Sequence, residues 1–202
     1  MIIWLVSYPK SGNTWVRLFL NSLILAPNET ININDIKLGQ FPVRKYFKDI
    51  TNNIDDVKEF IQNCNYAQSK INLDNKIKFF KTHQGKYTVG EDNFTDEENT
   101  IAVIYIVRDP RNVVTSISNH YTLSIKESLK FMLSDTIIGN KKSIEESYKE
   151  KKSGILTLLG KWNNHYRSWT RKKGNLLLIK YEDLILNPGT EILKISSFLK
   201  KY

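Results

Sequence analysis

A short loop near the N-terminus holds residues that are suited to binding an anion. It joins an apolar run over residues 2–6 to a helical pattern, and its polar members are Lys10, Ser11, Gly12, Asn13 and Thr14. Backbone N–H groups at the start of a helix attract negative charge, and a nearby lysine adds a point charge. The loop therefore predicts a phosphate or sulfate site.

The loop differs from a Walker A sequence, G-x-x-x-x-G-K-[ST], in which a lysine follows the last glycine and a hydroxyl holds Mg²⁺. Here Lys10 precedes Gly12, and the hydroxyls belong to Ser11 and Thr14. Taken alone, the loop also fits an ordinary strand-to-helix turn with a solvated lysine, because short loops with Lys and Gly are common.

The elements that position this loop alternate between strand and helix. Four nearly continuous apolar runs predict strands over residues 2–7, 77–82, 101–107 and 176–181. Such runs are typical of parallel strands that are covered on both faces. The alternation predicts one domain over residues 1–202, with a three-layer α/β/α fold around a central parallel sheet of the P-loop NTPase-like type.

Helices are predicted by a 3.6-residue periodicity and by capping signals. They run over residues 15–26, 110–121, 125–134 and 155–174, and a last helix begins at 188. Asp109 and Pro110 form a cap and a first helical position, and Ser124 with Glu127 forms a capping box. Residues 28–76 are rich in Asn and Asp and predict irregular structure and short helices near an acceptor site.

Composition narrows the possible partners only slightly. The formal net charge of +9 suits a polyanionic ligand, and by itself it fits a nucleic acid or an anionic membrane equally well. Residues 141–174 hold ten Lys or Arg and three Asp or Glu, and we expect a solvated helix pair there rather than a dedicated patch. Cys64 is the single cysteine, so an intramolecular disulfide is excluded.

Four segments are similar to the sequence motifs of one enzyme family. The sequence YPKSGNTW over residues 8–15 is similar to the family's 5′-phosphosulfate loop, Y-P-K-S-G-T-T-W, with Asn13 in place of a threonine. Residues 104–116 are similar to its 3′-phosphate segment, in which an arginine ends a strand and a serine follows eight residues later. Residues 81–83 match its K-T-H triplet, and residues 181–184 match its Y-E-D-[LM] element. In these residues and in their order along the chain, the sequence resembles the cytosolic-type sulfotransferases.

The resemblance implies transfer of a sulfuryl group from 3′-phosphoadenosine 5′-phosphosulfate (PAPS) to an acceptor hydroxyl or amine, without a metal. It implies donor contacts from Lys10, Ser11, Gly12, Asn13, Thr14, Trp15, Arg108, Ser116 and Tyr181. Arg108 and Ser116 would bind the 3′-phosphate, and Trp15 and Tyr181 would contact the adenine. The implied partner is a small-molecule or glycan acceptor rather than a nucleic acid.

Catalysis requires charge stabilisation and a base. Lys10 is placed to stabilise developing negative charge, and the resemblance adds Lys81 beside the transferred group. His83 follows the second long strand and is the expected base, with an ordinary pKa near 6.5. His120 and His165 match no catalytic motif, so we expect structural roles for both.

The chain ends differ from those of related classes. Residues 1–6 are too short an apolar run for a signal peptide or a membrane span, so a cytoplasmic location is expected. The family normally closes its donor site with a later segment of the R-K-G type. No such segment follows the motifs in this sequence, which is therefore expected to be either a natural short form or a fragment.

Two other functions fit parts of the sequence. In a P-loop small-molecule kinase, residues 104–109 would be a Walker B strand and Asp109 would hold Mg²⁺. The missing G-K-[ST] sequence counts against that interpretation. A non-catalytic nucleotide-binding module is the other alternative. A requirement for Mg²⁺ separates the kinase from the sulfotransferase, and turnover separates both enzymes from a binding module.

Overall fold

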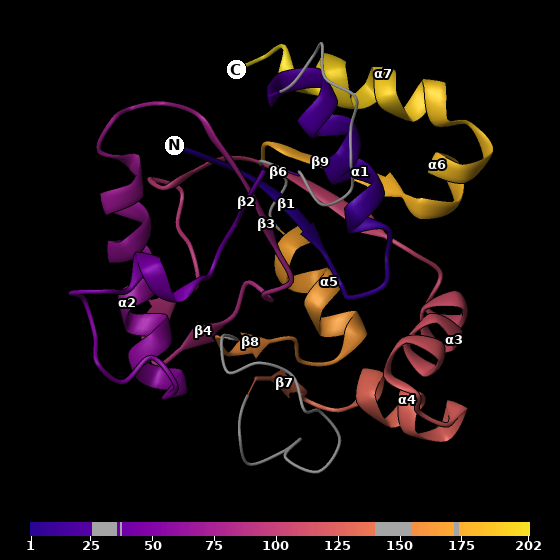
Figure 1. Ribbon diagram of the computed structural model, residues 1–202, viewed down its shortest axis with the longest axis horizontal. Helices are drawn as coiled ribbons and strands as arrows, with labels where there is room; N and C mark the ends of the chain where they lie inside the picture. The colour runs from indigo at the N-terminus through magenta and orange to yellow at the C-terminus, as the bar shows by residue number, and fades with distance from the viewer. Residues whose placement is uncertain (26–35, 37, 140–154, 172–173) are drawn as a thin grey trace.

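The computed structural model has a five-stranded parallel sheet at its centre (Figure 1). It describes residues 1–25, 36, 38–139, 155–171 and 174–202. In sheet order, the strands are β2 (Gly39–Gln40), β3 (Lys78–Thr82), β1 (Ile2–Ser7), β6 (Thr100–Val107) and β9 (Leu176–Lys180). The four predicted strands are confirmed to within one residue at each end. The edge strand β2 was not predicted, because two residues are too few to show a pattern.

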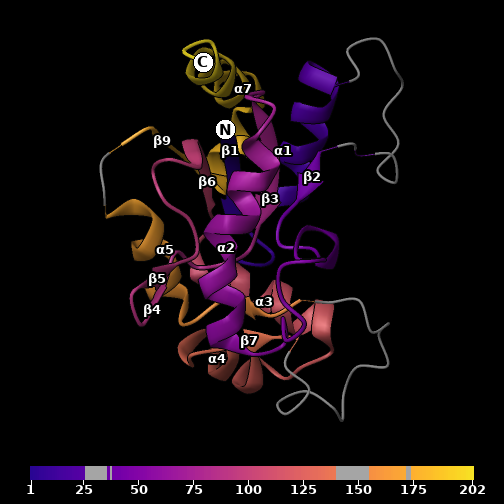
Figure 2. The same cartoon turned by 90° about the vertical axis from the view of Figure 1, so that its left-hand side faces the viewer.

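Helices cover both faces of the sheet, which confirms the three-layer α/β/α fold. Ile2, Trp4 and Val6 of β1 pack in one core cluster with α2 (Val57–Asn72) and α5 (Trp162–Thr170). Ile3 and Leu5 face the opposite way, toward α1 (Asn13–Leu20), α6 (Tyr181–Leu186) and α7 (Pro188–Leu199). Figure 2 shows α2 in front of the sheet. The alternation along β1 is the pattern of a strand that is buried on both sides.

Two helices extend the fold near the carboxyl ends of the strands. They are α3 (Pro110–Tyr121) and α4 (Ile125–Leu133), which pack on each other and on Tyr8 in a third apolar cluster. The Asp109 side chain accepts from the backbone N–H of Arg111. Ser124 and Glu127 form the complete capping box. Both predicted helix starts are therefore confirmed.

The segment 28–76 contains a long helix, so the prediction of short helices and irregular structure there was wrong for α2. This helix has 16 residues, and the Asp56 side chain caps it by accepting from the N–H groups of Lys58 and Glu59. Its buried side includes Phe60, Ile61, Cys64, Ala67 and Gln68. Residues 26–35 and 37 lie outside the described part. The rest of the segment forms β2 and a 3₁₀ turn at Arg44–Tyr46.

The helix predicted from residue 155 begins only at Trp162. Residues 155–159 are extended instead and include β8 (Thr157–Leu158), which pairs antiparallel with β7 (Ile137–Ile138). Gly160 then turns the chain with a φ of +60°. Ile155, Leu158 and Leu159 are all buried, so their apolar spacing resembled a helical stripe. Within the basic segment 141–174, residues 141–154 and 172–173 lie outside the described residues, and with them much of the expected solvated helix pair.

Other element ends also shift. The first helix is α-helical only to Leu20 and continues as a π-helical turn at Asn21–Leu25. The short antiparallel pair β4 (Thr88–Val89) and β5 (Asp92–Asn93) lies beside α2. Tyr181 begins α6 instead of ending β9. Among the described helices, none combines the length and apolar character that a membrane span requires.

Candidate functional site

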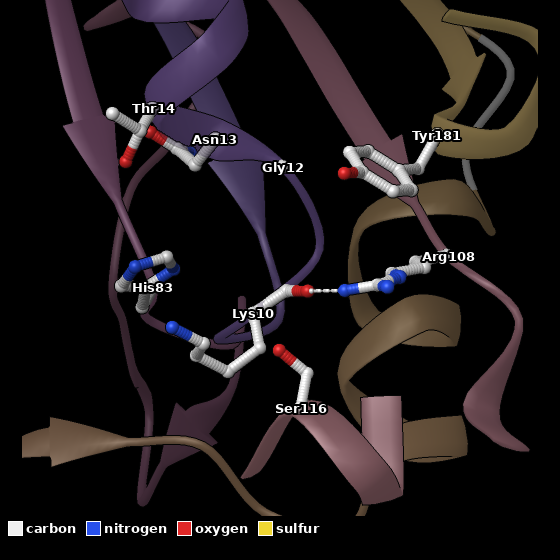
Figure 3. Close-up of a pocket in the computed structure, with 8 residues that line it drawn as sticks. All are labelled: Lys10, Gly12, Asn13, Thr14, His83, Arg108, Ser116 and Tyr181. Carbon is white, nitrogen blue, oxygen red and sulfur yellow. Dashed lines mark hydrogen bonds between the residues drawn. The ribbon is translucent and has the colours of Figure 1, made fainter. Parts of the chain in front are cut away.

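A cavity of about 270 Å³ opens at the carboxyl ends of the central strands (Figure 3). Its lining residues are Lys10, Gly12, Asn13, Thr14, His83, Arg108, Ser116 and Tyr181. The strand order places β3 on one side of β1 and β6 on the other. In open α/β sheets, ligands bind in the crevice outside the strand ends where the chain order changes direction.

The loop between β1 and α1 has two residues in the left-handed region. Lys10 has a φ of +67° and Gly12 a φ of +93°. A Cβ atom on Gly12 would lie 2.2 Å from Cδ2 of Tyr181, so only glycine fits against that ring. Gly12 also caps α1, and among the described residues no side-chain hydrogen bond caps the helix N-terminus. The positive end of α1 is thus left to a ligand.

Arg108 connects the end of β6 to this loop. Its Nη1 donates to the backbone carbonyl of Lys10 at 2.9 Å, and its guanidinium lies 4.5 Å from the centre of the Tyr181 ring (Figure 3). Its Nε is buried and has no hydrogen-bond partner among the described residues. A buried donor without a partner is costly, so an anion that accepts from this guanidinium would be stabilised.

His83 has the tautomer that a base requires. Its Nδ1 lies 2.6 Å from the backbone carbonyl oxygen of Ser7. Because a carbonyl only accepts, Nδ1 carries the proton and Nε2 keeps its lone pair. In Figure 3, the side chain of Lys10 extends toward this ring across the cavity. Burial, and then the charge of Lys81, hold the pKa of His83 well below its usual value. The expected pKa near 6.5 was therefore too high.

Asn13 and Ser7 link the start of α1 to the same histidine. The Asn13 side-chain amide donates to the Ser7 hydroxyl at 3.2 Å, and that hydroxyl lies 3.4 Å from Nδ1 of His83. Asn13 was predicted only as a donor contact. Ser7 was not predicted, although a serine that ends a buried apolar strand next to the loop is a visible signal.

Lys81 and Arg17 add positive charge beside the cavity without lining it. Lys81 pairs in register with Leu5 on the α1 side of the sheet. Burial, and then the charge of Arg17, lower the pKa of Lys81 to about 8. Arg17 lies one turn after Asn13 and Thr14 on α1, and its Nε is buried without a partner in the described part of the chain. Arg17 was not predicted, although a charge within the apolar face of α1 could have indicated it.

Two other residues that were predicted to contact the sulfuryl donor do not line the cavity. Ser11 is buried, and its hydroxyl has no partner within the described ranges. Trp15 packs against the core cluster on the α1 side. Their contacts with a donor, like those of Lys81, remain predictions. The structure does bring Lys10, Gly12, Asn13, Thr14, His83, Arg108, Ser116 and Tyr181 to one cavity.

Asp109, the magnesium ligand of the kinase alternative, is engaged elsewhere. Its carboxylate caps α3 and accepts from both the backbone and the guanidinium of Arg111. These hydrogen bonds lower the pKa of Asp109 to about 2. Asp109 does not line the cavity. Its role as a helix cap accounts for the aspartate at the end of β6.

Comparisons with curated proteins find relatives along the whole chain. The amine sulfotransferase of Oryctolagus cuniculus is 25% identical over 205 residues, which are 98% of this chain and 56% of that protein. Sulfotransferase 1B1 of Canis lupus familiaris is 26% identical over 203 residues, 98% of this chain and 59% of that protein. The chain thus spans under two thirds of the length of these relatives.

Solved structures share the fold. Mouse sulfotransferase SULT7A1, crystallised with PAP, matches with a TM-score of 0.58 and 22% identity over 98% of this chain and 58% of that one. Retinol dehydratase with androsterone and PAP matches with a TM-score of 0.56 and 19% identity, over 98% and 59% of the two chains. The family model described as "Sulfotransferase domain" matches residues 2–202. By this match, the chain belongs to the sulfotransferase family.

Proposed function

We propose that this protein transfers a sulfuryl group from PAPS to the hydroxyl or amine of a small-molecule or glycan acceptor. One observation carries the proposal: a lysine, an arginine and a base-competent histidine from three separate strand ends line one cavity with an open helix N-terminus. The buried, unpartnered Nε of Arg108 and hydroxyl of Ser11 fit an anionic ligand that accepts hydrogen bonds.

The fit extends to both ends of the donor. The loop at residues 10–14 would hold the 5′-phosphosulfate against the N-terminus of α1. Arg108 and Ser116 would hold the 3′-phosphate, and Tyr181 would contact the adenine. The solved relatives in complex with PAP, the desulfated product 3′,5′-diphosphoadenosine, support this donor.

When bound, PAPS would supply an activated sulfuryl group for transfer from its 5′-phosphate oxygen to the oxygen or nitrogen of the acceptor. His83 takes the acceptor proton on Nε2, which its hydrogen bond to Ser7 leaves free. Lys10 stabilises the negative charge that develops on the departing phosphate oxygen. Lys81, with its pKa of about 8, is close enough for its charge to lower the pKa of His83 and would support the transferred group from beside the cavity.

A ligand-binding assay and a turnover assay test the proposal. Thermal unfolding is measured with 3′,5′-diphosphoadenosine and with ATP–Mg²⁺ at the same concentration, and a ligand present at 100 times its Kd adds about 2.7 kcal/mol of stability. We expect stabilisation by the first ligand and sulfuryl transfer in the presence of a chelator. Lys10→Ala should lower turnover by roughly 10²-fold. Phosphoryl transfer that depends on Mg²⁺ would establish the kinase instead.

The location and the remaining alternative belong to the same proposal. We propose a cytoplasmic enzyme, in line with the curated relative named cytosolic sulfotransferase 1 in Danio rerio. Binding of 3′,5′-diphosphoadenosine without turnover on any acceptor panel would favour a non-catalytic nucleotide-binding module. Secretion of the native protein into the medium would contradict the proposed location.

A further inference from the structure

A second histidine lies directly behind the base. His165, on α5, is fully buried and does not line the cavity. Its Nε2 lies 3.1 Å from the backbone carbonyl oxygen of His83. Its Nδ1 lies 2.8 Å from the hydroxyl of Tyr105, which comes from β6. The His165 ring on α5 thus forms hydrogen bonds with Tyr105 of the central sheet and with the backbone of His83, the expected base.

The chemistry of the three groups fixes the direction of both hydrogen bonds. The His83 carbonyl can only accept, so Nε2 of His165 must carry a proton. Burial lowers the pKa of His165 to about 4, so the ring is neutral near pH 7 and Nδ1 is an acceptor. The Tyr105 hydroxyl therefore donates to His165, and His165 donates to His83. Every polar atom of this buried ring is satisfied.

The ring itself is held in place by packing. The Tyr8 ring meets it edge-on, with the centroids 5.4 Å apart, and the Tyr105 ring lies 5.8 Å away. The hydrogen bond to His83 therefore comes from a donor with little freedom to move. A rigid donor is what positioning a catalytic group requires.

The next residue is anchored separately. Gln84 is buried, and its side-chain amide donates to Leu156 and accepts from the N–H of Leu158. Its backbone carbonyl accepts from the indole N–H of Trp169 at 2.8 Å. These contacts fix the chain after His83 but leave the His83 carbonyl to His165. The backbone of His83 is thus restrained from behind by His165, while its ring is restrained by Ser7.

We propose that Tyr105 and His165 form a positioning pair that sets the orientation of the His83 imidazole in the cavity. The inference rests on the proposed function, because it assigns His83 as the base. Neither residue reaches the cavity, so neither touches a substrate. Misplacement of a catalytic group by about 1 Å can lower a rate by roughly 10²-fold, which is the size of effect available to such a pair.

The experiment compares variants that keep or remove the two hydrogen bonds. His165→Leu removes the donor and the acceptor, His165→Gln supplies an amide N–H and a carbonyl on a side chain of similar reach, and Tyr105→Phe removes only the hydroxyl. We expect kcat to fall by roughly 10²-fold in His165→Leu and by about tenfold in Tyr105→Phe. His165→Gln should recover most of the lost rate. The Kd for 3′,5′-diphosphoadenosine should stay within about twofold in all three.

A double variant and a core control separate positioning from lost stability. Because the two residues act in series, Tyr105→Phe combined with His165→Leu should be no slower than His165→Leu alone. Cys64→Ala removes a fully buried sulfur from α2, far from His83 in the sequence, and should leave kcat unchanged. A loss of kcat in Cys64→Ala that matches its loss of stability, or additive losses in the double variant, would overturn the proposal.

Histidine NMR gives a readout that does not depend on turnover. We expect the protonated Nδ1 of His83 and the protonated Nε2 of His165 in the parent, and displaced His83 ring signals in His165→Leu and Tyr105→Phe. Displaced signals in a chain that never transfers sulfate would contradict the proposed function and still support the pair. Unchanged His83 signals in both variants would overturn the pair, whatever the activity of the parent.

Discussion

The backbone carbonyl of Ser7 accepts a hydrogen bond from Nδ1 of His83 at 2.6 Å, so the end of β1 sets the protonation of a ring that follows β3. The two strands are direct neighbours in register, with Val6 opposite Thr82. The pairing of β1 with β3 therefore brings Ser7 and His83 together, 76 residues apart in the chain. The register between β1 and β3 therefore also determines which ring nitrogen of His83 carries the proton.

The first prediction concerns the pH dependence of turnover. Burial and the charge of Lys81 keep the pKa of His83 well below 6.5. The base should thus remain unprotonated at pH 6.5, and kcat should fall only at clearly lower pH. His83→Ala should reduce kcat by roughly 10²- to 10⁴-fold and abolish this limb. Steady-state rates from pH 4.5 to 8.5 test it, and a limb centred at 6.5 would contradict the assigned environment.

The second prediction concerns the pH dependence of stability. The folded pKa values of His83 and His165 lie below the unfolded value of about 6.5, and that of His165 is about 4. Below pH 6.5 the unfolded chain therefore binds protons that the folded chain excludes, and stability falls. For His165 this loss should continue to pH 4 at up to about 1.4 kcal/mol per pH unit.

Urea unfolding at each pH measures this loss. His165→Gln removes one of the two groups and should flatten the decline between pH 6.5 and 4. His120→Gln is the matched control, because His120 is an exposed histidine on α3. An equal decline in the parent and in His165→Gln would contradict the prediction.

The third prediction concerns recognition of the 3′-phosphate. Arg108→Ala should weaken binding of 3′,5′-diphosphoadenosine by about 1.5–3 kcal/mol, the range for a hydrogen bond to a charged group. Ligands without the 3′-phosphate should lose far less. Arg111→Ala is the control, because its guanidinium is exposed and pairs with Asp109. Calorimetric titration with ligands that have or lack the 3′-phosphate tests this prediction. An equal loss of affinity for both ligands would show that Arg108 does not bind the 3′-phosphate.

The fourth prediction concerns the close approach at Gly12. A Cβ atom at this position would lie 2.2 Å from the Tyr181 ring. The substituted residue would also have to keep a φ of +93°, which residues with a side chain rarely adopt. Gly12→Ala should therefore displace Tyr181 and weaken nucleotide binding at least tenfold. Gly90→Ala separates the two causes, because Gly90 has a φ of +65° and no atom within 4 Å of its virtual Cβ. That control should lose stability by about 1–2 kcal/mol and keep its nucleotide affinity.

The fifth prediction concerns Arg17. Burial, and then the charge of Arg17, lower the pKa of Lys81 to about 8, so Arg17→Met should raise that pKa by the smaller of the two contributions. At pH 8 the Lys81 amine would then be less reactive, and its acetylation, followed by mass spectrometry, should slow. Arg167→Met, on the exposed side of α5, should change nothing. Equal acetylation rates in all three proteins would show that Arg17 does not act on Lys81.

Local signals in the sequence were sufficient for most of the fold. Continuous apolar runs located β1, β3, β6 and β9, and short-range hydrogen bonds at Asp109 and Ser124 explain why those helix starts were predictable. The cap at Asp56 was equally local, yet α2 was missed among the many Asn and Asp residues around it. The extended segment at 155–159 was mistaken for helix because Gln84, over 70 residues earlier, supplies its hydrogen bonds.

The residues of the site also divide into those that a sequence motif predicted and those that it did not. Sequence motifs predicted Lys10, His83, Arg108, Ser116 and Tyr181, which now line one cavity. Tyr105 and His165 were missed as site residues because their effects depend on contacts across the fold, whereas Ser7 and Arg17 each had a local sequence signal that was overlooked. The contact of His165 with His83 spans 82 residues, and that of Tyr105 with His165 spans 60. Neither contact has a signature in local sequence.

The hydrogen bond from Arg108 to the Lys10 carbonyl has a consequence for substrate choice. The Arg108 guanidinium that would bind the 3′-phosphate also donates a hydrogen bond to the backbone of Lys10, which would bind the 5′-phosphosulfate. The 3′-phosphate site and the 5′-phosphosulfate site are therefore connected by a direct hydrogen bond. A nucleotide without its 3′-phosphate would leave Arg108 freer to shift, and Lys10 would lose part of its support. We expect discrimination between donors to be expressed in the speed of the chemical step as well as in affinity.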